Sequence, residues 1–175
     1  MERLTRGTIL RALKELARSL PPDRAHSLVL VGGAALVLLY DARESTKDVD
    51  AFLLGSGSGD VLRRAAGEVA TTMGLPADWL NDGAKGYVHG LALGERLLSV
   101  PNLEVRTTVP AQLLAMKLSA WRDDVDIADA RLLLSKLAGD RESVWRQIEP
   151  HLVPGRELKA GYGFADLWEA SRGLA

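Results

Sequence analysis

Apolar positions follow a helical period over the first twenty residues and then fall into two short continuous runs. Residues 5–20 carry leucine and isoleucine three or four positions apart, and Pro21-Pro22 ends the pattern, which predicts an amphipathic helix. The runs at 28–31 and 49–54 are apolar at most positions, as strands buried in a sheet are. Residues 34–42, between these runs, have a helix-forming composition. This alternation predicts an α/β fold.

The middle of the chain predicts one more helix and a pair of strands. The expected elements are, in order, a flexible glycine- and serine-rich loop over 55–59, a helix over 61–73 with Asp60 as its N-cap, irregular chain over 75–86, and strands over 96–100 and 103–108. Trp79 is expected to anchor the irregular chain to the core. Pro101-Asn102 is a turn signal that suits an antiparallel pair of strands, so the sheet is expected to be mixed.

The last third of the chain is predicted to be helical. Pro110 suits the first turn of a helix that runs to about Trp121. The following helix is expected to end at Gly139. Its N-cap is one of three aspartates, Asp123, Asp124 or Asp126. Apolar side chains after residue 141 suffice for one or two further packed helices.

Length and composition favour one compact unit. The chain has 175 residues, of which 47% are hydrophobic and 26% charged, enough to bury a core of ordinary size. We expect a sheet-containing core over residues 1–109. A helical part over residues 110–175 is expected to pack on this core.

Charge and residue usage exclude several classes of protein. The 22 basic and 23 acidic side chains nearly cancel, so no overall attraction to DNA or to an anionic membrane is expected. The absence of cysteine excludes disulfides, thiolate zinc sites and cysteine nucleophiles. The three histidines stand singly, without the spacing of metal ligands. No signal peptide or membrane-spanning run is visible, and a cytoplasmic protein is expected.

Two aspartates one residue apart mark the start of the second apolar run. Successive side chains of a strand alternate between its faces, so Asp48 and Asp50 point the same way. Two ionised carboxylates this close repel each other and need a compensating cation beside an apolar core. Magnesium is the obvious cation, because it takes one or two carboxylates together with the phosphates of a substrate. The alternative is a solvated strand end that faces Lys47 or Arg43.

A glycine pair follows the first apolar run. Gly32 and Gly33 lead into the predicted helix, which places backbone amides and a helix N-terminus where phosphate oxygens can sit. We therefore predict that both glycines bind a nucleotide, with the hydroxyl of Thr46 at the mouth of the same pocket. The alternatives are a plain tight turn at the glycines and a hydroxyl that only serves the loop backbone.

A second group of polar residues lies in the C-terminal half. Lys117 is a lysine on an otherwise apolar helix face. Asp126 and Asp129 are three residues apart and share one side of the next helix. The alternatives are a lysine whose stem packs on the helix while its head reaches solvent, and aspartates that only favour a helix N-terminus.

Together these motifs resemble the minimal nucleotidyltransferases of the DNA polymerase beta superfamily. Their pattern is a Gly-Gly or Gly-Ser turn followed, a helix later, by Asp-x-Asp on a strand. In this chain the pattern is carried by Gly32, Gly33, Asp48 and Asp50. A lysine followed by Asp-x-x-Asp and an aliphatic run resembles a subgroup, the nucleotidyltransferase toxins of bacterial toxin-antitoxin and abortive-infection systems. Residues 79–83 are similar to one branch of that subgroup.

The resemblance implies a magnesium-dependent enzyme that transfers a nucleoside monophosphate from a nucleoside triphosphate to an acceptor hydroxyl. Asp48 and Asp50 would hold Mg²⁺, and Lys117 would pair with the triphosphate. Asp126 or Asp129 would orient this lysine or act as a base. In the toxin subgroup the acceptor is the 3′ end of transfer RNA, so the chain would inhibit translation, with an antitoxin protein as a possible partner.

The resemblance leaves two other functions open. A small hydroxyl acceptor, such as an aminoglycoside, would use the same chemistry, and a catalytically inactive relative would only bind nucleotide. The family pattern also includes a third carboxylate on a later strand, for which Glu104 is the candidate.

Overall fold

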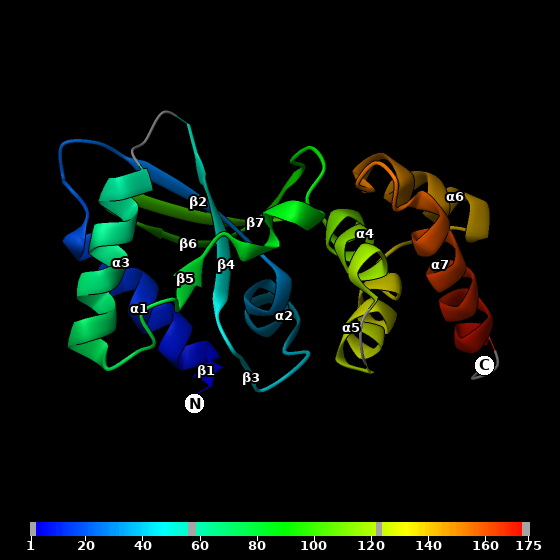
Figure 1. The fold of residues 1–175 in the computed structure, drawn as a ribbon, viewed down its shortest axis with the longest axis horizontal. Coiled ribbons are helices and arrows are strands. Elements are labelled where there is room, and N and C mark those ends of the chain that lie inside the picture. The colour runs from blue at the N-terminus through cyan, green and yellow to red at the C-terminus, as the bar shows by residue number, and fades with distance from the viewer. Residues whose placement is uncertain (1–2, 56–58, 122–123, 173–175) are drawn as a thin grey trace. The chain divides into compact units, whose positions relative to one another are not determined.

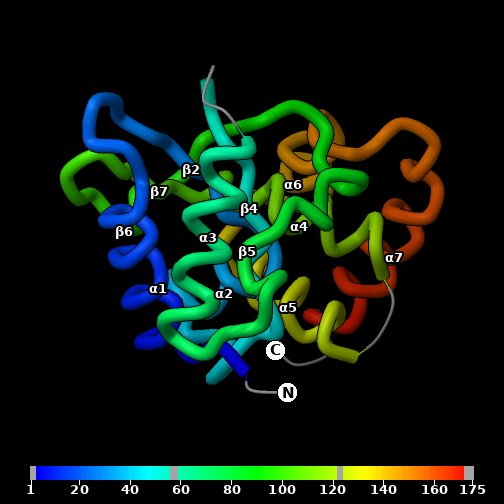
Figure 2. Tube along the Cα trace, turned by 60° about the vertical axis from the view of Figure 1, so that its left-hand side comes forward, coloured from blue at the N-terminus to red at the C-terminus, as the bar shows by residue number. Residues whose placement is uncertain are grey.

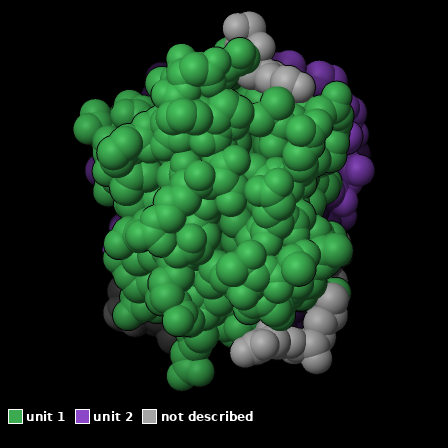
Figure 3. All heavy atoms as spheres, turned by 90° about the vertical axis from the view of Figure 1, so that its left-hand side faces the viewer, with its two compact units in different colours: residues 1–84, 93–107 green, residues 85–92, 108–175 purple. Residues whose placement is uncertain are grey.

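The chain forms two compact units, which Figure 3 shows in different colours. A computed structural model describes residues 3–55, 59–121 and 124–172. The first unit comprises residues 1–84 and 93–107, and the second comprises residues 85–92 and 108–175. The second unit thus takes in the segment 85–92 in addition to the predicted helical part. That the two parts pack together as one stays a prediction.

A five-stranded sheet forms the centre of the first unit (Figure 1). Its strands are β2 (His26–Val31), β4 (Val49–Leu54), β5 (Leu80–Asn81), β6 (Leu93–Val100) and β7 (Leu103–Thr108). The strand order is β5-β4-β2-β7-β6. Strand β2 runs antiparallel to β4 and parallel to β7, while β4 runs parallel to β5. The predicted α/β fold with a mixed sheet is therefore confirmed.

One face of this sheet packs on two helices. The helices of the first unit are α1 (Arg6–Ser19), α2 (Gly32–Tyr40) and α3 (Gly59–Met73). Helices α1 and α3 lie side by side (Figures 1 and 2) and share one apolar cluster with the sheet. The cluster takes Leu28 and Leu30 from β2 and Val49 and Ala51 from β4. Because strand side chains alternate, Asp50 points to the opposite face.

Trp79 anchors β5 to the core, as predicted. Its side chain is fully buried, and its indole Nε1 donates a hydrogen bond to the carbonyl of Ala66 on α3 at 3.0 Å. Its own carbonyl accepts a hydrogen bond from the backbone N–H of Val49 at 2.7 Å. Trp79 therefore links helix α3, strand β4 and the start of β5.

Several short elements differ from the prediction. The stretch 75–86, expected to be irregular, contains β5 and the start of the 3-10 helix η1 (Gly83–Tyr87). A two-stranded antiparallel sheet of β1 (Leu4–Thr5) and β3 (Ser45–Thr46) was not predicted either. Strands of two residues are too short to show an alternating pattern. Helix α3 begins at Gly59, so Asp60 lies in its first turn beside Arg63 and is not the N-cap.

The second unit is helical, as predicted. Its elements are α4 (Pro110–Ala120), α5 (Asp124–Leu134), α6 (Arg141–Ile148), the 3-10 helix η2 (Glu149–His151) and α7 (Glu157–Arg172). Helix α5 ends before the predicted Gly139, and Asp140 then caps α6 by accepting a hydrogen bond from Ser143 N at 2.8 Å. Among the described residues, none of the helices combines the length and apolarity needed to cross a membrane.

Candidate functional site

The two aspartates lie at one end of β4, as predicted. Asp48 directly precedes the strand, Asp50 is its second residue, and both are half-buried. Asp50 pairs with Val31, which is both the last residue of β2 and the N-cap of α2. The carboxylates therefore lie where β2 turns into α2.

Asn81 belongs to the same group, although the sequence indicated only irregular chain at this position. Strand β5 places it beside Asp50 in the parallel ladder. Its Nδ2 donates a hydrogen bond to Asp48 Oδ2 at 3.1 Å. The Asn-Asp-Gly sequence is a signal for an asparagine that bonds the backbone two residues on. The contact with Asp48 depends on long-range strand pairing, which no local pattern reveals.

Backbone amides after Asn81 complete the polar network. Gly83 N donates to Asn81 Oδ1 at 2.7 Å, and Ala84 N donates to Asp50 Oδ1 at 3.0 Å. Each aspartate thus accepts a hydrogen bond from a neutral donor.

The predicted glycine pair begins α2 against the same group. Gly32 has a φ of 61°, and a Cβ at this position would lie 3.1 Å from Asp50 Oδ2. A Cβ at Gly33 would collide with Thr46 Oγ1. The N-cap residue of α2 makes no side-chain hydrogen bond to the first turn. The structure therefore brings Gly32, Gly33, Thr46 and Asp50 together at a helix N-terminus, where the first backbone N–H groups have no partner within the helix.

Glu104, the candidate third carboxylate, lies outside this group. It pairs with Ser27, four residues along β2 from the residue that pairs with Asp50, which is about 13 Å along the strand. Its carboxylate forms ion pairs with Arg96 Nε at 3.3 Å and Arg106 Nη1 at 3.6 Å. Glu104 is on the expected face of the sheet but at the wrong position along it.

The oxygen atoms of the group suit a hard divalent cation. Asp48 and Asp50 supply carboxylate oxygens, and Asp50 Oδ2 lies 3.1 Å from the position that a Cβ at Gly32 would take. In the described parts of the chain, no three histidine, aspartate or glutamate side chains are placed to hold a metal. Magnesium typically needs only one or two carboxylates, with water and phosphates as the other ligands. The donor set therefore fits the magnesium site, which stays a prediction.

Lys117, Asp126 and Asp129 meet in the second unit. Lys117 Nζ lies 2.8 Å from Asp126 Oδ1 and 2.7 Å from Asp129 Oδ2. The side chain of Lys117 is 12% exposed and each aspartate side chain 4%. Helix α5 begins at Asp124, so Asp126 lies inside its first turn and is not the N-cap; Asp123 lies outside the described residues. The lysine head is held between two buried acids.

His151, one of the single histidines, lies in the second unit and feels the charge of His89. Burial, together with the charge of His89, lowers the pKa of His151 from its ordinary value of 6.5. As the pH falls, the unfolded chain takes up this proton before the folded chain, so stability is lost below about pH 6.5. We expect His151→Gln to flatten the dependence of unfolding free energy on pH between about pH 5 and 7, measured by urea denaturation. An unchanged slope would contradict this.

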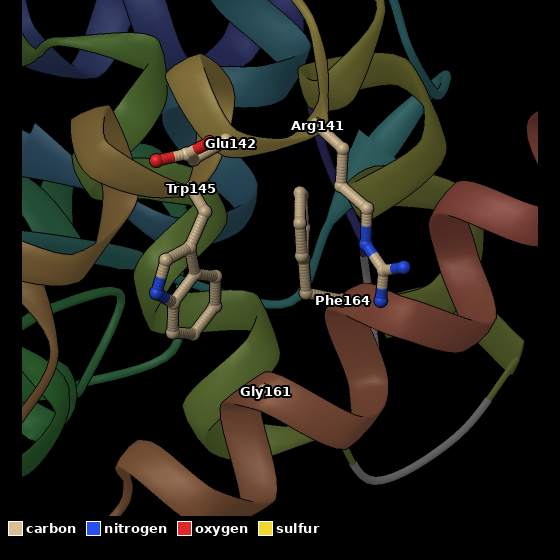
Figure 4. A pocket seen from close by; sticks show the side chains of 5 residues that line it. All are labelled: Arg141, Glu142, Trp145, Gly161 and Phe164. Atoms are coloured by element: carbon tan, nitrogen blue, oxygen red, sulfur yellow. The ribbon is translucent and has the colours of Figure 1, made fainter.

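A cavity of about 370 Å³ in the second unit contains none of the predicted site residues (Figure 4). It is lined by Arg141, Glu142, Trp145, Gly161 and Phe164, from α6 and α7. The rings of Trp145 and Phe164 lie 5.2 Å apart and tilted by 41°, the geometry of packed aromatic side chains. The predicted chemistry therefore lies elsewhere in the chain.

A comparison with known protein families gives a match over most of the chain. Residues 8–138 match the model of a family described as "Nucleotidyltransferase of unknown function (DUF6036)". The match includes all the predicted site residues of both units. The search of curated proteins found no match, and the search of solved structures found none.

Proposed function

The chain belongs to this nucleotidyltransferase family, and from its membership and the geometry of the first unit we propose that it is a magnesium-dependent enzyme. It transfers a nucleoside monophosphate from a nucleoside triphosphate to an acceptor hydroxyl. The observation that carries the proposal is the pair Asp48 and Asp50 beside the N-terminus of α2, held by neutral hydrogen-bond donors.

The proposed reaction forms one phosphorus–oxygen bond and breaks another. The acceptor oxygen attacks the α-phosphorus, the bond to the β-phosphate oxygen breaks, and pyrophosphate leaves while the hydroxyl proton passes to a base. Asp48 and Asp50 hold Mg²⁺, which when bound offsets negative charge on the phosphates. The contribution of the protein is to keep both carboxylates on one face of the sheet, at the start of β4.

The start of α2 is the proposed site for the phosphates. Gly32 and Gly33 begin the helix without side chains of their own, and its first backbone N–H groups are the proposed donors to the phosphate oxygens. The side chains of Asp50, Thr46 and Arg43 lie close to the space that a Cβ would take at these two positions. The hydroxyl of Thr46 lies against Gly33 and is the proposed additional donor to the phosphate oxygens.

Lys117 is proposed to pair with the triphosphate, with Asp126 and Asp129 as the residues that orient it. The two ion pairs to Lys117 Nζ support the orienting role, because they fix the ammonium from two sides. Asp126 or Asp129 is also the proposed base that takes the acceptor proton.

The proposed acceptor is the 3′ end of transfer RNA, and the proposed consequence is inhibition of translation. The resemblance to the toxin subgroup supports both, through Lys117 and the Asp-x-x-Asp pair that follows it. An antitoxin protein would be the natural partner of such an enzyme.

A labelling experiment tests the proposed function. The pure chain is incubated with Mg²⁺, total transfer RNA and each labelled nucleoside triphosphate in turn, beside an Asp48→Ala variant. We expect label to enter RNA with the wild-type chain and not with Asp48→Ala. The triphosphate that gives this label identifies the transferred nucleotide.

The other outcomes separate the remaining functions. If label enters an aminoglycoside but not RNA, the acceptor is a small molecule and the proposed nucleotidyl transfer still holds. Magnesium-dependent nucleotide binding without any transfer would identify an inactive relative. Equal labelling by Asp48→Ala would overturn the proposed role of the carboxylates.

A further inference from the structure

We propose that Asn81 is a positioning residue that holds both carboxylates of the magnesium site through one side chain. That Asp48 and Asp50 form a metal site rests on the proposed function. The evidence for the role of Asn81 is the hydrogen-bond network of the first unit. Figure 1 shows β5 beside β4, and this pairing brings Asn81 to the two aspartates.

Asp48 is held directly. Asn81 Nδ2 donates to Asp48 Oδ2 at 3.1 Å, and the same nitrogen donates to the carbonyl of Asp78 at 3.2 Å. Both N–H bonds of the amide are therefore used, which fixes the plane of the side chain as well as its position. Asp48 precedes β4 and lacks the ladder that holds Asp50, so this side-chain contact limits its movement.

Asp50 is held indirectly, through a turn that Asn81 shapes. Asn81 Oδ1 accepts a hydrogen bond from Gly83 N at 2.7 Å, which folds the chain back towards β4. The next amide, Ala84 N, then donates to Asp50 Oδ1 at 3.0 Å. A Cβ at Gly83 would lie 2.8 Å from Asn81 Oδ1, so the close approach within this turn requires glycine.

An amide suits this position better than the third acid of the family pattern. A carboxylate at residue 81 would accept from Gly83 N but could not donate to Asp48, and it would add repulsion to two like charges. Asparagine supplies one acceptor and two donors, and the structure uses all three. Asn81 is therefore a neutral residue that sets the spacing of the two carboxylates.

Two variants of the full chain separate the contact of Asn81 with Asp48 from its contact with the turn that holds Asp50. Asn81→Ala removes the donor and the acceptor, whereas Asn81→Asp removes only the donor. In metal-free protein we expect the Gly83 and Ala84 amides to lose protection from hydrogen exchange in Asn81→Ala, and the Gly83 amide to keep it in Asn81→Asp. Equal protection in wild type and Asn81→Ala would overturn the proposal.

Mn²⁺ binding, measured by calorimetry without nucleotide, tests the consequence for the site. Loss of a residue that orients metal ligands typically costs 10-fold to 100-fold in affinity, and we expect a rise in dissociation constant of about tenfold or more for Asn81→Ala. In an Asp48→Asn background the same substitution is expected to have a much smaller effect, because the two residues act together. Full additivity would overturn the link between them.

Asn102→Ala provides the matched control. Asn102 is also a turn asparagine of the first unit, and its Nδ2 donates to the carbonyls of Ala17 and Leu20 at 2.9 Å and 3.1 Å. Its loss is expected to lower the melting temperature and leave Mn²⁺ affinity unchanged. A wild-type chain that binds no Mn²⁺ would refute the magnesium site, while amide exchange would still decide whether Asn81 holds the two carboxylates.

Discussion

Replacing Asp50 with asparagine is expected to slow nucleotide transfer by about a hundredfold to a thousandfold while leaving the chain folded. Asparagine keeps an oxygen that can accept the hydrogen bond from Ala84 N, so the local backbone retains its partner. What is lost is one of the two negative charges proposed to hold magnesium. The measurement is the rate of label transfer at saturating triphosphate and Mg²⁺.

The same variant is expected to lose activity but not stability when no metal is bound. Asp48 and Asp50 are like charges on one face of β4, and removing one relieves their repulsion. With a chelator present, we therefore expect Asp50→Asn to melt at or above the wild-type temperature. A lower melting temperature than wild type would mean that the Asp50 carboxylate stabilises the fold.

Glu104→Gln is the control for this prediction. Glu104 lies on the same sheet but pairs with Arg96 and Arg106 at the surface, away from the two aspartates. Such exposed pairs contribute about 0–1 kcal/mol, so little change in stability or rate is expected. A large loss of transfer in Glu104→Gln would contradict the assignment of the site to Asp48 and Asp50.

Replacing Lys117 with methionine is expected to destabilise the chain by about 3–5 kcal/mol. Methionine matches the lysine stem in length but leaves Asp126 and Asp129 buried without their cation. An unpaired buried charge costs more than the ion pair contributes, which makes this substitution much worse than a typical surface change. Urea denaturation at neutral pH measures the effect.

A triple variant separates charge from packing in this cluster. Lys117→Met combined with Asp126→Asn and Asp129→Asn removes all three charges while keeping the volumes similar. We expect it to recover most of the lost stability while remaining inactive, because the proposed contact with the triphosphate is gone. A single Lys117→Met variant within about 1 kcal/mol of wild type would contradict the buried ion pairs.

The sequence predicts the features of this site that depend on local periodicity. Asp48 and Asp50 share a face because a strand has a period of two residues, and Gly32 lies at the start of a helix because the apolar pattern changes period there. Asp126 and Asp129 share one side of α5 for the corresponding helical reason. Each of these relations spans only a few residues and does not depend on which distant segments pair.

Features that depend on the pairing of distant strands were not predictable in this way. The period of two placed Glu104 on the right face of the sheet, but only the register between β2 and β7 shows that it pairs with Ser27, far from Asp50. Asn81 enters the site because β5 pairs with β4, and a strand of two residues has no pattern of its own. The sequence therefore suggested Asp48 and Asp50 as site residues and gave no role to Asn81, which contacts Asp48 and pairs with Asp50.

The buried indole of Trp79 makes the geometry of the site depend on a distant helix. Trp79 is bonded to α3 through Ala66, its carbonyl holds the residue between the two aspartates, and Asn81 follows two residues later. A movement of α3 relative to the sheet would therefore shift Trp79, and with it the backbone next to both carboxylates. Substitutions in the apolar core around α3 are therefore expected to change the affinity of the proposed metal site through Trp79.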